Sequence, residues 1–152
     1  MKDGLKASLK RLERLVHIRD TYVSVAEASV KEAETHVRNL EVAEREVAGN
    51  IQHTQEGIAY LETATGHDVQ TGERYIHALE KQRKLIQQSL EKANSNLDQR
   101  RVEWTEAMRE HKIASKLQER RLHQWEREVD VAQQKSQDDA FLARYIRSRF
   151  EK

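Results

Sequence analysis

An apolar seven-residue repeat constrains the fold of this chain more than any other feature. From Leu5 to Leu61, alternating steps of four and three residues reach seventeen positions, and fourteen of them are apolar. A helix of a globular protein does not keep such a pattern over eight heptads, whereas a coiled coil does. The positions are Leu5, Leu9, Leu12, Val16, Arg19, Val23, Ala26, Val30, Ala33, Val37, Leu40, Glu44, Val47, Ile51, Thr54, Ile58 and Leu61. The repeat predicts a long helix that packs against another helix along one seam.

A second seam begins at Ile76 and continues to Ala132. It contains Ile76, Leu79, Arg83, Ile86, Leu90, Ala93, Leu97, Arg100 and Trp104, and then Met108, His111, Ser115, Gln118, Leu122, Trp125, Val129 and Ala132. Two successive steps of four after Arg100 predict a stutter, which locally unwinds a left-handed supercoil. We interpret Trp104 and Trp125 as packing residues of this seam, with contact to a partner ring as the alternative.

A polar stretch bounded by Gly66 and Gly72 separates the two seams. Glycine near a helix end permits the left-handed cap conformation, and Asp68 or Thr71 can cap the following helix. We therefore predict an all-α fold, a long antiparallel two-helix coiled-coil hairpin that forms a single domain over residues 1–152.

The predicted hairpin has a first helix over about 3–63, a turn over about 64–72 and a second helix over about 73–148. Residues whose numbers sum to about 137 would face each other, so that Leu61 meets Ile76 and Leu5 meets Ala132. The competing fold is a parallel homodimer of one continuous rod, which would leave two glycines and a polar stretch in its middle.

The second helix is expected to overhang the first from about residue 133. Apolar residues still repeat there at helical spacing: Phe141, Leu142, Tyr145, Ile146 and Phe150. An apolar helix face with nothing to cover it is typical of a surface that binds another protein. A frayed tail is the alternative interpretation.

The composition favours a helical protein without an enzymatic site. The chain has 35% charged residues, no Pro, no Cys and a net charge of only +1, so neither a compact core nor a nucleic-acid binder is indicated. The Glu/His pairs four residues apart, such as Glu32/His36, lack the spacing of a di-iron bundle and are interpreted as solvated partners. No phosphate-binding loop occurs. We expect no enzyme activity, metal, cofactor or small-molecule substrate.

Charge is nonetheless unevenly distributed. Residues 1–19 contain six Lys/Arg against two Asp/Glu, and residues 20–46 contain three against seven. The basic stripe near the N-terminus comprises Lys6, Lys10, Arg11 and Arg14. Such a stripe binds an anionic membrane surface, docks an acidic protein or is simply a solvated helix face. No apolar run is long enough to span a bilayer, and a soluble cytoplasmic protein is expected.

Three segments of the chain stand out: LKRLERLVHIRDTYVSVAEASVKEAE at residues 9–34, DVQTGERYIHALEKQ after the turn and EHKIASKLQERRLHQWEREVDVAQQKSQDDAF toward the end. They resemble the FliJ family, the stalk components of the flagellar type III export apparatus, and more distantly their virulence-system counterparts of the YscO type. The resemblance covers nearly the whole chain.

The resemblance implies an antiparallel coiled coil similar to that of the rotary ATPase γ subunit. It implies three partners: a hexameric export ATPase, the cytoplasmic domain of the membrane export-gate protein, and export chaperones that the protein helps to recycle. The protein would be a monomer, associated peripherally with the inner membrane through the export apparatus. The end that carries both termini would face the ATPase, through Leu9, Leu12, Val16, Val129, Phe141, Leu142, Tyr145 and Ile146.

The resemblance also places the export-gate contact shortly after the turn. Carried over to this chain, the contact residues are Tyr75, Leu79, Gln82 and Ile86, with His53 from the first helix. Gln82 and Ile86 differ in type from the family pattern. Leu79 and Ile86 are also seam positions, so that a role in stability is an equal alternative for them. Tyr75 lies off the seam.

Other functions remain open at this point. The alternatives are a YscO-type virulence stalk, a chaperone-escort coiled coil without ATPase contact, and a structural homodimeric scaffold.

Overall fold

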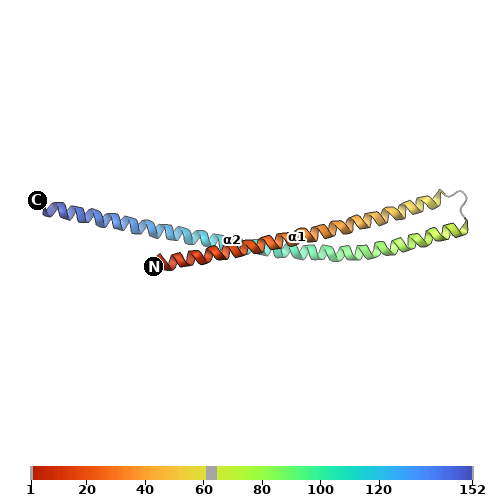
Figure 1. The fold of residues 1–152 in the computed structure, drawn as a ribbon, viewed down its shortest axis with the longest axis horizontal. Helices are drawn as coiled ribbons and strands as arrows, with labels where there is room; N and C mark the ends of the chain where they lie inside the picture. Colours follow the sequence, from red (N-terminus) through yellow and green to blue (C-terminus); the bar gives the residue numbers. More distant parts are fainter. Residues whose placement is uncertain (1, 61–64, 152) are drawn as a thin grey trace. The chain divides into compact units, whose positions relative to one another are not determined.

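The chain folds as two long helices joined by a short connection (Figure 1). The structure, a computed structural model, describes residues 2–60 and 65–151. Helix α1 spans Lys2–Ala59 and helix α2 spans Gly66–Phe150, and the described residues contain no strand. The predicted all-α antiparallel two-helix hairpin is confirmed: α1 packs against α2 of the same chain.

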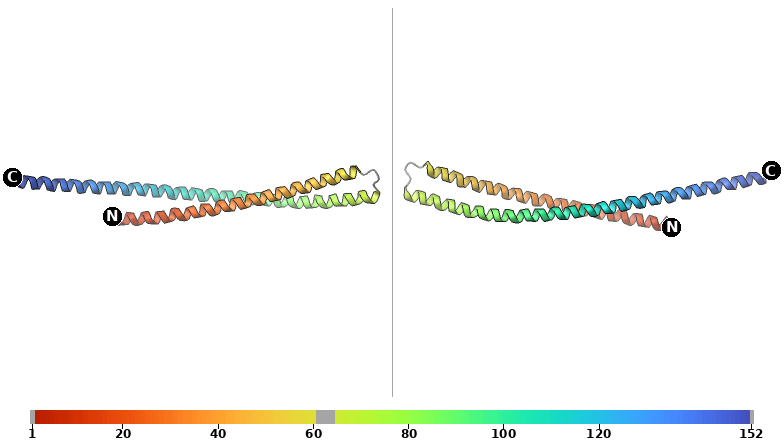
Figure 2. Two further views of the ribbon diagram at one scale, coloured as in Figure 1. Left: turned by 45° about the horizontal axis from the view of Figure 1, so that its top comes forward. Right: turned by 180° about the vertical axis from the view of Figure 1, so that it is seen from behind.

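The hairpin divides into two compact units, which are described separately. The turn unit comprises Ser24–Thr105, and the terminal unit comprises Met1–Val23 with Glu106–Lys152. Within each unit, a segment of α1 runs antiparallel to a segment of α2 (Figures 1 and 2). The turn unit therefore contains the reversal of the chain, and the terminal unit contains both chain ends.

The seam predicted for α1 is the buried stripe of that helix. Every predicted position from Leu5 to Ile58 is buried or half-buried, and Leu61 lies outside the described residues. In the turn unit one core cluster contains Val30, Ala33, Val37, Ala93 and Leu97, and a second contains Val47, Ile51 and Leu79. No described side chain is completely buried. This follows from a core one layer thick, in which each side chain is covered by a single opposing helix.

The polar positions of the seam pair with charges on the opposite helix. In the turn unit, Arg83 Nε lies 2.7 Å from Glu44 Oε1, and both were predicted seam positions. In the terminal unit, Arg19 forms an ion pair with Glu110. Polar residues inside a coiled-coil seam specify its register, because any other alignment leaves them without partners.

The stutter predicted directly after Arg100 lies further along α2 than expected. Met108 and Leu122 are exposed at 44% and 43%, whereas Ala107 is half-buried and Ala114 is buried. The three-four stepping therefore continues through two alanines as far as Gln118, and the larger apolar neighbours lie outside the seam. Because Val129 is half-buried and Glu128 is exposed, the change of step falls between Gln118 and Val129. Met108 was predicted because it is more hydrophobic than Ala107, but the small side chain of alanine allows two helices to approach closely. Arg100 is also exposed.

The predicted register is displaced by about one heptad. A residue sum of 137 places Leu79 opposite Ile58, but Leu79 instead packs with Val47 and Ile51. In the terminal unit His111 Nε2 lies 3.8 Å from Asp20 Oδ1, a pair whose numbers sum to 131. Because the seam repeats every seven residues, a shift of seven still brings apolar residues together. The apolar pattern alone does not distinguish these alignments.

Helix α2 begins at Gly66, seven residues earlier than predicted. Thr65 is its N-cap: the Asp68 backbone N–H donates to Thr65 Oγ1, and the Thr65 N–H donates to Asp68 Oδ2, both at 3.3 Å. This reciprocal arrangement is a capping box, which satisfies two backbone donors at the helix start. Thr71 is not a cap, because its hydroxyl donates to the His67 carbonyl inside the helix.

Gly72 belongs to the helix interface rather than to the turn. A Cβ atom at this position would lie 2.6 Å from Ile58 Cδ1, closer than van der Waals contact allows. No described residue has a positive φ angle, so neither Gly66 nor Gly72 adopts the predicted left-handed cap. The glycine here permits close approach of α1 and α2. Among the described residues of the predicted turn, only Thr65 lies outside the helices.

Candidate interaction surfaces

The last part of α2, in the terminal unit, has no covering helix. Ala132 is half-buried, and every residue from 133 to 151 is exposed. We call residues 133–150 the C-terminal overhang. It has no Gly and no Pro, and Arg147 and Arg149 in its last turn interact favourably with the negative end of the helix dipole. The overhang is therefore an uncovered continuation of α2.

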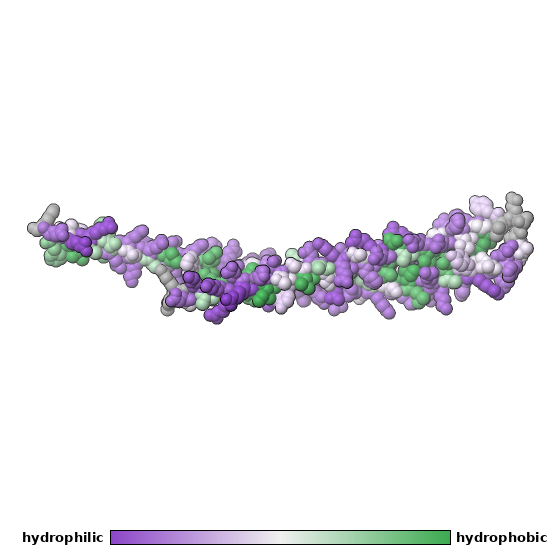
Figure 3. All heavy atoms as spheres, viewed as in Figure 1, coloured by the Kyte–Doolittle hydropathy of each residue, from purple (hydrophilic) through white to green (hydrophobic). Residues whose placement is uncertain are grey.

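One face of the overhang is apolar. Phe141 is 68% exposed, Phe150 is 85% exposed, and Leu142, Tyr145 and Ile146 are each about half exposed. Pairs three or four residues apart, such as Phe141/Tyr145 and Leu142/Ile146, share a side of the helix. Figure 3 shows hydrophobic side chains gathered along one side of the end of α2. Contiguous apolar surface of this kind marks a protein-binding site.

The residues predicted to contact an ATPase ring all lie in the terminal unit, but they fall into two groups. The first group is half-buried between α1 and α2, so that only part of each side chain is exposed: Leu9, Leu12, Val16 and Val129. The second group lies on the overhang, where each side chain is at least half exposed: Phe141, Leu142, Tyr145 and Ile146. The second group offers much more apolar area to a partner than the first.

The residues predicted to contact an export gate all lie in the turn unit. Tyr75 is 52% exposed, and Gln82 and His53 are exposed. Tyr75 and Gln82 are seven residues apart, which places them on the same face of α2. Among the described residues, no hydrogen bond or ion pair joins His53 to either of them.

The two seam members of that set are core residues. Leu79 is only 7% exposed and forms a cluster with Val47 and Ile51, and half-buried Ile86 packs against the cluster. A partner would reach Leu79 only by separating the helices.

A groove in the terminal unit was not predicted from the sequence. It encloses about 730 Å³ and is lined by Glu13, Arg14, Val16, His17, Ile18, Asp20, His111 and Gln118. The available signal was the polar character of His111 and Gln118, two seam positions of α2 that leave a gap between the helices. The described residues contain no group of three or more His, Cys, Asp or Glu side chains placed to hold a metal ion.

Trp104 is a packing residue, as interpreted from the sequence. It is half-buried against the cluster of Val30, Ala33 and Val37 in the turn unit. Its indole Nε1 is buried and has no hydrogen-bond partner among the described residues. A groove of about 360 Å³ adjoins the ring, next to Glu27 and Arg101. Trp125, in the terminal unit, is also half-buried.

Comparisons with known proteins identify a family. The family model described as "Flagellar FliJ protein" matches residues 8–150, which include most of both helices and every predicted contact residue. No curated protein and no solved structure matches the chain. No helix in the described parts of the chain is long and apolar enough to cross a membrane.

Proposed function

The chain belongs to the flagellar FliJ protein family, and on that premise we propose that it is a non-enzymatic stalk and adaptor of the export ATPase. Family membership makes it a stalk-type protein of flagellar protein export. We propose further that the terminal unit contacts the hexameric ATPase ring and that the turn unit contacts the cytoplasmic domain of the export gate. Export chaperones are the third class of partner.

The exposed apolar face of the C-terminal overhang is the observation that carries the ATPase contact. Four large apolar side chains on one side of an uncovered helix have no role in the hairpin's own packing: Phe141, Leu142, Tyr145 and Ile146. Complete burial of such a side chain is worth about 1.5–3 kcal/mol, so that a partner covering even part of the face gains substantial binding energy. Arg144, Arg147 and Arg149 on the same segment favour an acidic lining in the partner.

The gate contact is supported by Tyr75, Gln82 and His53, which are exposed in the turn unit. Tyr75 is the principal candidate, since an exposed aromatic ring offers a large contact area with a polar hydroxyl. Leu79 and Ile86 act by holding α2 against α1. The protein works as a cytoplasmic monomer, held at the inner membrane through the export apparatus.

ATP hydrolysis by the cognate export ATPase tests the proposal. We expect the full-length chain to raise the hydrolysis rate under conditions in which the ATPase forms its hexamer. Replacing Phe141, Tyr145 and Ile146 by Ser should reduce this stimulation, because the face then loses most of its apolar area. Leu85→Ser is the matched control, since Leu85 is a similarly exposed apolar residue of α2 in the turn unit.

Two results would count against the proposal. One is no stimulation by the full-length chain, and the other is equal loss with the control and with the triple replacement. Binding of the gate's cytoplasmic domain is measured separately, so that the two contacts are tested independently.

A further inference from the structure

A second exposed apolar surface lies in the terminal unit, on the paired segments of α1 and α2 rather than on the overhang. Its members are Leu15, Ile18 and Tyr22 on α1, and Ile113 and Leu117 on α2. Leu15 is half-buried, and the other four are 41–60% exposed. We call these five residues the side patch. None of them belongs to the predicted seam or to the proposed contacts with the ATPase and the gate.

Contacts of Arg19 place the two halves of the side patch on one side of the helix pair. The Arg19 guanidinium lies 5.9 Å from the centre of the Tyr22 ring on α1 and forms an ion pair with Glu110 on α2. Ile113 and Leu117 follow Glu110 by three and seven residues, which places them on the same side of α2. Ile18 precedes Tyr22 by four residues and shares its side of α1.

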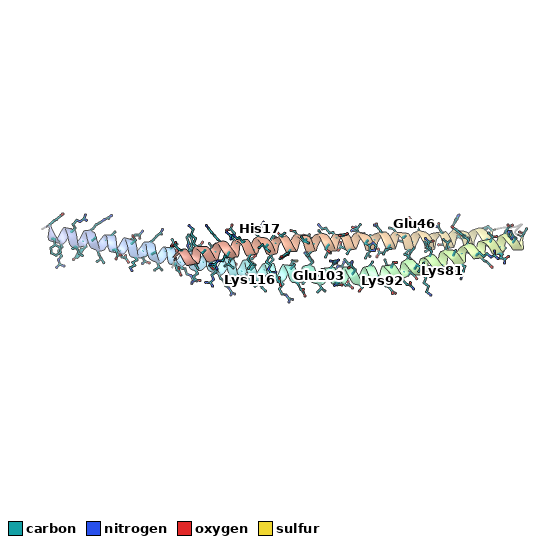
Figure 4. All side chains as sticks on the ribbon, turned by 60° about the horizontal axis from the view of Figure 1, so that its bottom comes forward. His17, Glu46, Lys81, Lys92, Glu103 and Lys116 are labelled. Carbon is teal, nitrogen blue, oxygen red and sulfur yellow. The ribbon has the colours of Figure 1, made fainter. Side chains whose placement is uncertain are left out.

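The border of the side patch is strongly basic. The charged residues one helical turn from a patch residue are Arg11, Arg14, Arg19, Arg109, Glu110, Lys116, Arg120 and Arg121. Glu110 is the one acid among them, and Arg19 neutralises it. None of the six others forms an ion pair within the part of the chain that the structure describes. Figure 4 shows Lys116 on the side of α2 that faces away from α1.

We propose that the side patch binds an amphipathic helix whose apolar stripe is flanked by Asp and Glu. Apolar side chains on two adjacent helices form a strip along the helix axes, which is the shape that a third helix packs against. The two basic borders then face the acidic flanks of that helix. The partner would add a third strand to the coiled coil of the terminal unit.

The other occupants fit the patch less well. A second copy of the chain would bring two basic borders together, which is unfavourable. A membrane favours a wide face of protruding apolar side chains, whereas the four exposed patch side chains are each roughly half covered by their own helices. The partially covered side chains suit the interlocking of side chains between helices.

The test uses the full-length protein and a labelled synthetic helix of about three heptads, with Leu at its a and d positions and Glu at e and g. Fluorescence anisotropy measures its dissociation constant. We expect the Glu peptide to bind at least tenfold more tightly than the same peptide with Lys in place of Glu. Ile113→Ser with Leu117→Ser should weaken binding at least tenfold.

Met108→Ser with Leu122→Ser is the matched control and should leave the affinity within about twofold. These two residues are exposed to a similar extent on the same helix. Met108 directly follows the seam residue Ala107, whereas Leu117 directly precedes Gln118, so that they lie on opposite sides of the seam. Circular dichroism of both double variants verifies that each keeps its helices.

Four outcomes would overturn the proposal. They are no binding of the Glu peptide up to about 1 mM, equal affinity for both peptides, equal losses in the two double variants, and a different occupant. Light scattering that reveals a dimer dissociated by the Ile113/Leu117 replacements would assign the patch to a second copy. Binding to anionic lipid vesicles that needs these residues, without peptide binding, would assign it to a membrane. ATPase stimulation is not used in this test, so that it stands or falls separately from the proposed function.

Discussion

Replacing Gly72 by Ala tests the register of the turn unit. An Ala Cβ at position 72 would lie 2.6 Å from Ile58 Cδ1 and 2.9 Å from Ile58 Cγ1. Rotation about χ2 moves Cδ1 away, but Cγ1 moves only with χ1, which is stiff for a β-branched residue in a helix. The replacement therefore combines a gain in helix propensity of about 1 kcal/mol with overpacking that costs about 1–3 kcal/mol.

Gly49→Ala and Gly57→Ala supply the reference. Both glycines are exposed inside α1, and an added Cβ meets nothing within 4 Å at either position. Each replacement should raise the free energy of unfolding by about 1 kcal/mol. The free energy of unfolding of the Gly72→Ala variant should be lower than that of Gly49→Ala by the overpacking cost, about 1–3 kcal/mol. Urea unfolding followed by circular dichroism measures both values.

A double-mutant cycle with Ile58→Ala isolates the contact. In that background both close atoms are absent, and Gly72→Ala should stabilise the protein as much as Gly49→Ala does. Equal stabilisation by Gly72→Ala and Gly49→Ala in the unmodified chain would refute the reasoning. It would show that Ile58 is not opposite Gly72, and that the register is not the one described.

Three further results are expected. Thr65→Ala removes the N-cap of α2 and should lower the free energy of unfolding by about 1 kcal/mol; unchanged hydrogen exchange in the first turn would show that the capping box does not form. Tyr75→Ala should weaken binding to the gate domain while helicity stays constant. Leu79→Ala should instead lower the free energy of unfolding by about 2–4 kcal/mol. A loss of helicity with Tyr75→Ala would show that Tyr75 stabilises the fold and is not a contact residue. Glu44→Ala should destabilise more than Glu44→Leu combined with Arg83→Leu, because the single change leaves a charge without its partner in the seam; urea unfolding compares them, and the reverse order would contradict the argument.

The candidate contact residues separate according to exposure, which the sequence pattern reports only indirectly. Leu79 belongs to two predictions at once: the heptad pattern makes it a seam residue, and the family resemblance makes it a gate contact. Burial resolves the overlap, since Leu79 is 7% exposed and Tyr75 is 52% exposed. The side patch was not predicted from the sequence because its two halves are far apart in the chain, although residues 15, 18 and 22 have helical spacing. Only the pairing of α1 with α2 brings Ile113 and Leu117 to the same side of the helix pair.

The sequence by itself determined the fold class and the buried face of α1. A seven-residue apolar repeat has one solution in water, a helix that buries that stripe against another helix, and the polar interruption implied that the second helix belongs to the same chain. These features are local and periodic. They can be read without knowing which residues meet.

The tertiary structure decided the register, the start of α2 and the choice of Ala107 over Met108. Apolar burial is non-directional, so that a displacement of one heptad buries nearly the same side chains. Directional contacts remove that degeneracy: the Glu44–Arg83 ion pair and the Gly72–Ile58 approach each allow only one alignment. Such contacts join residues distant in the sequence, and they exist only once the two helices are packed.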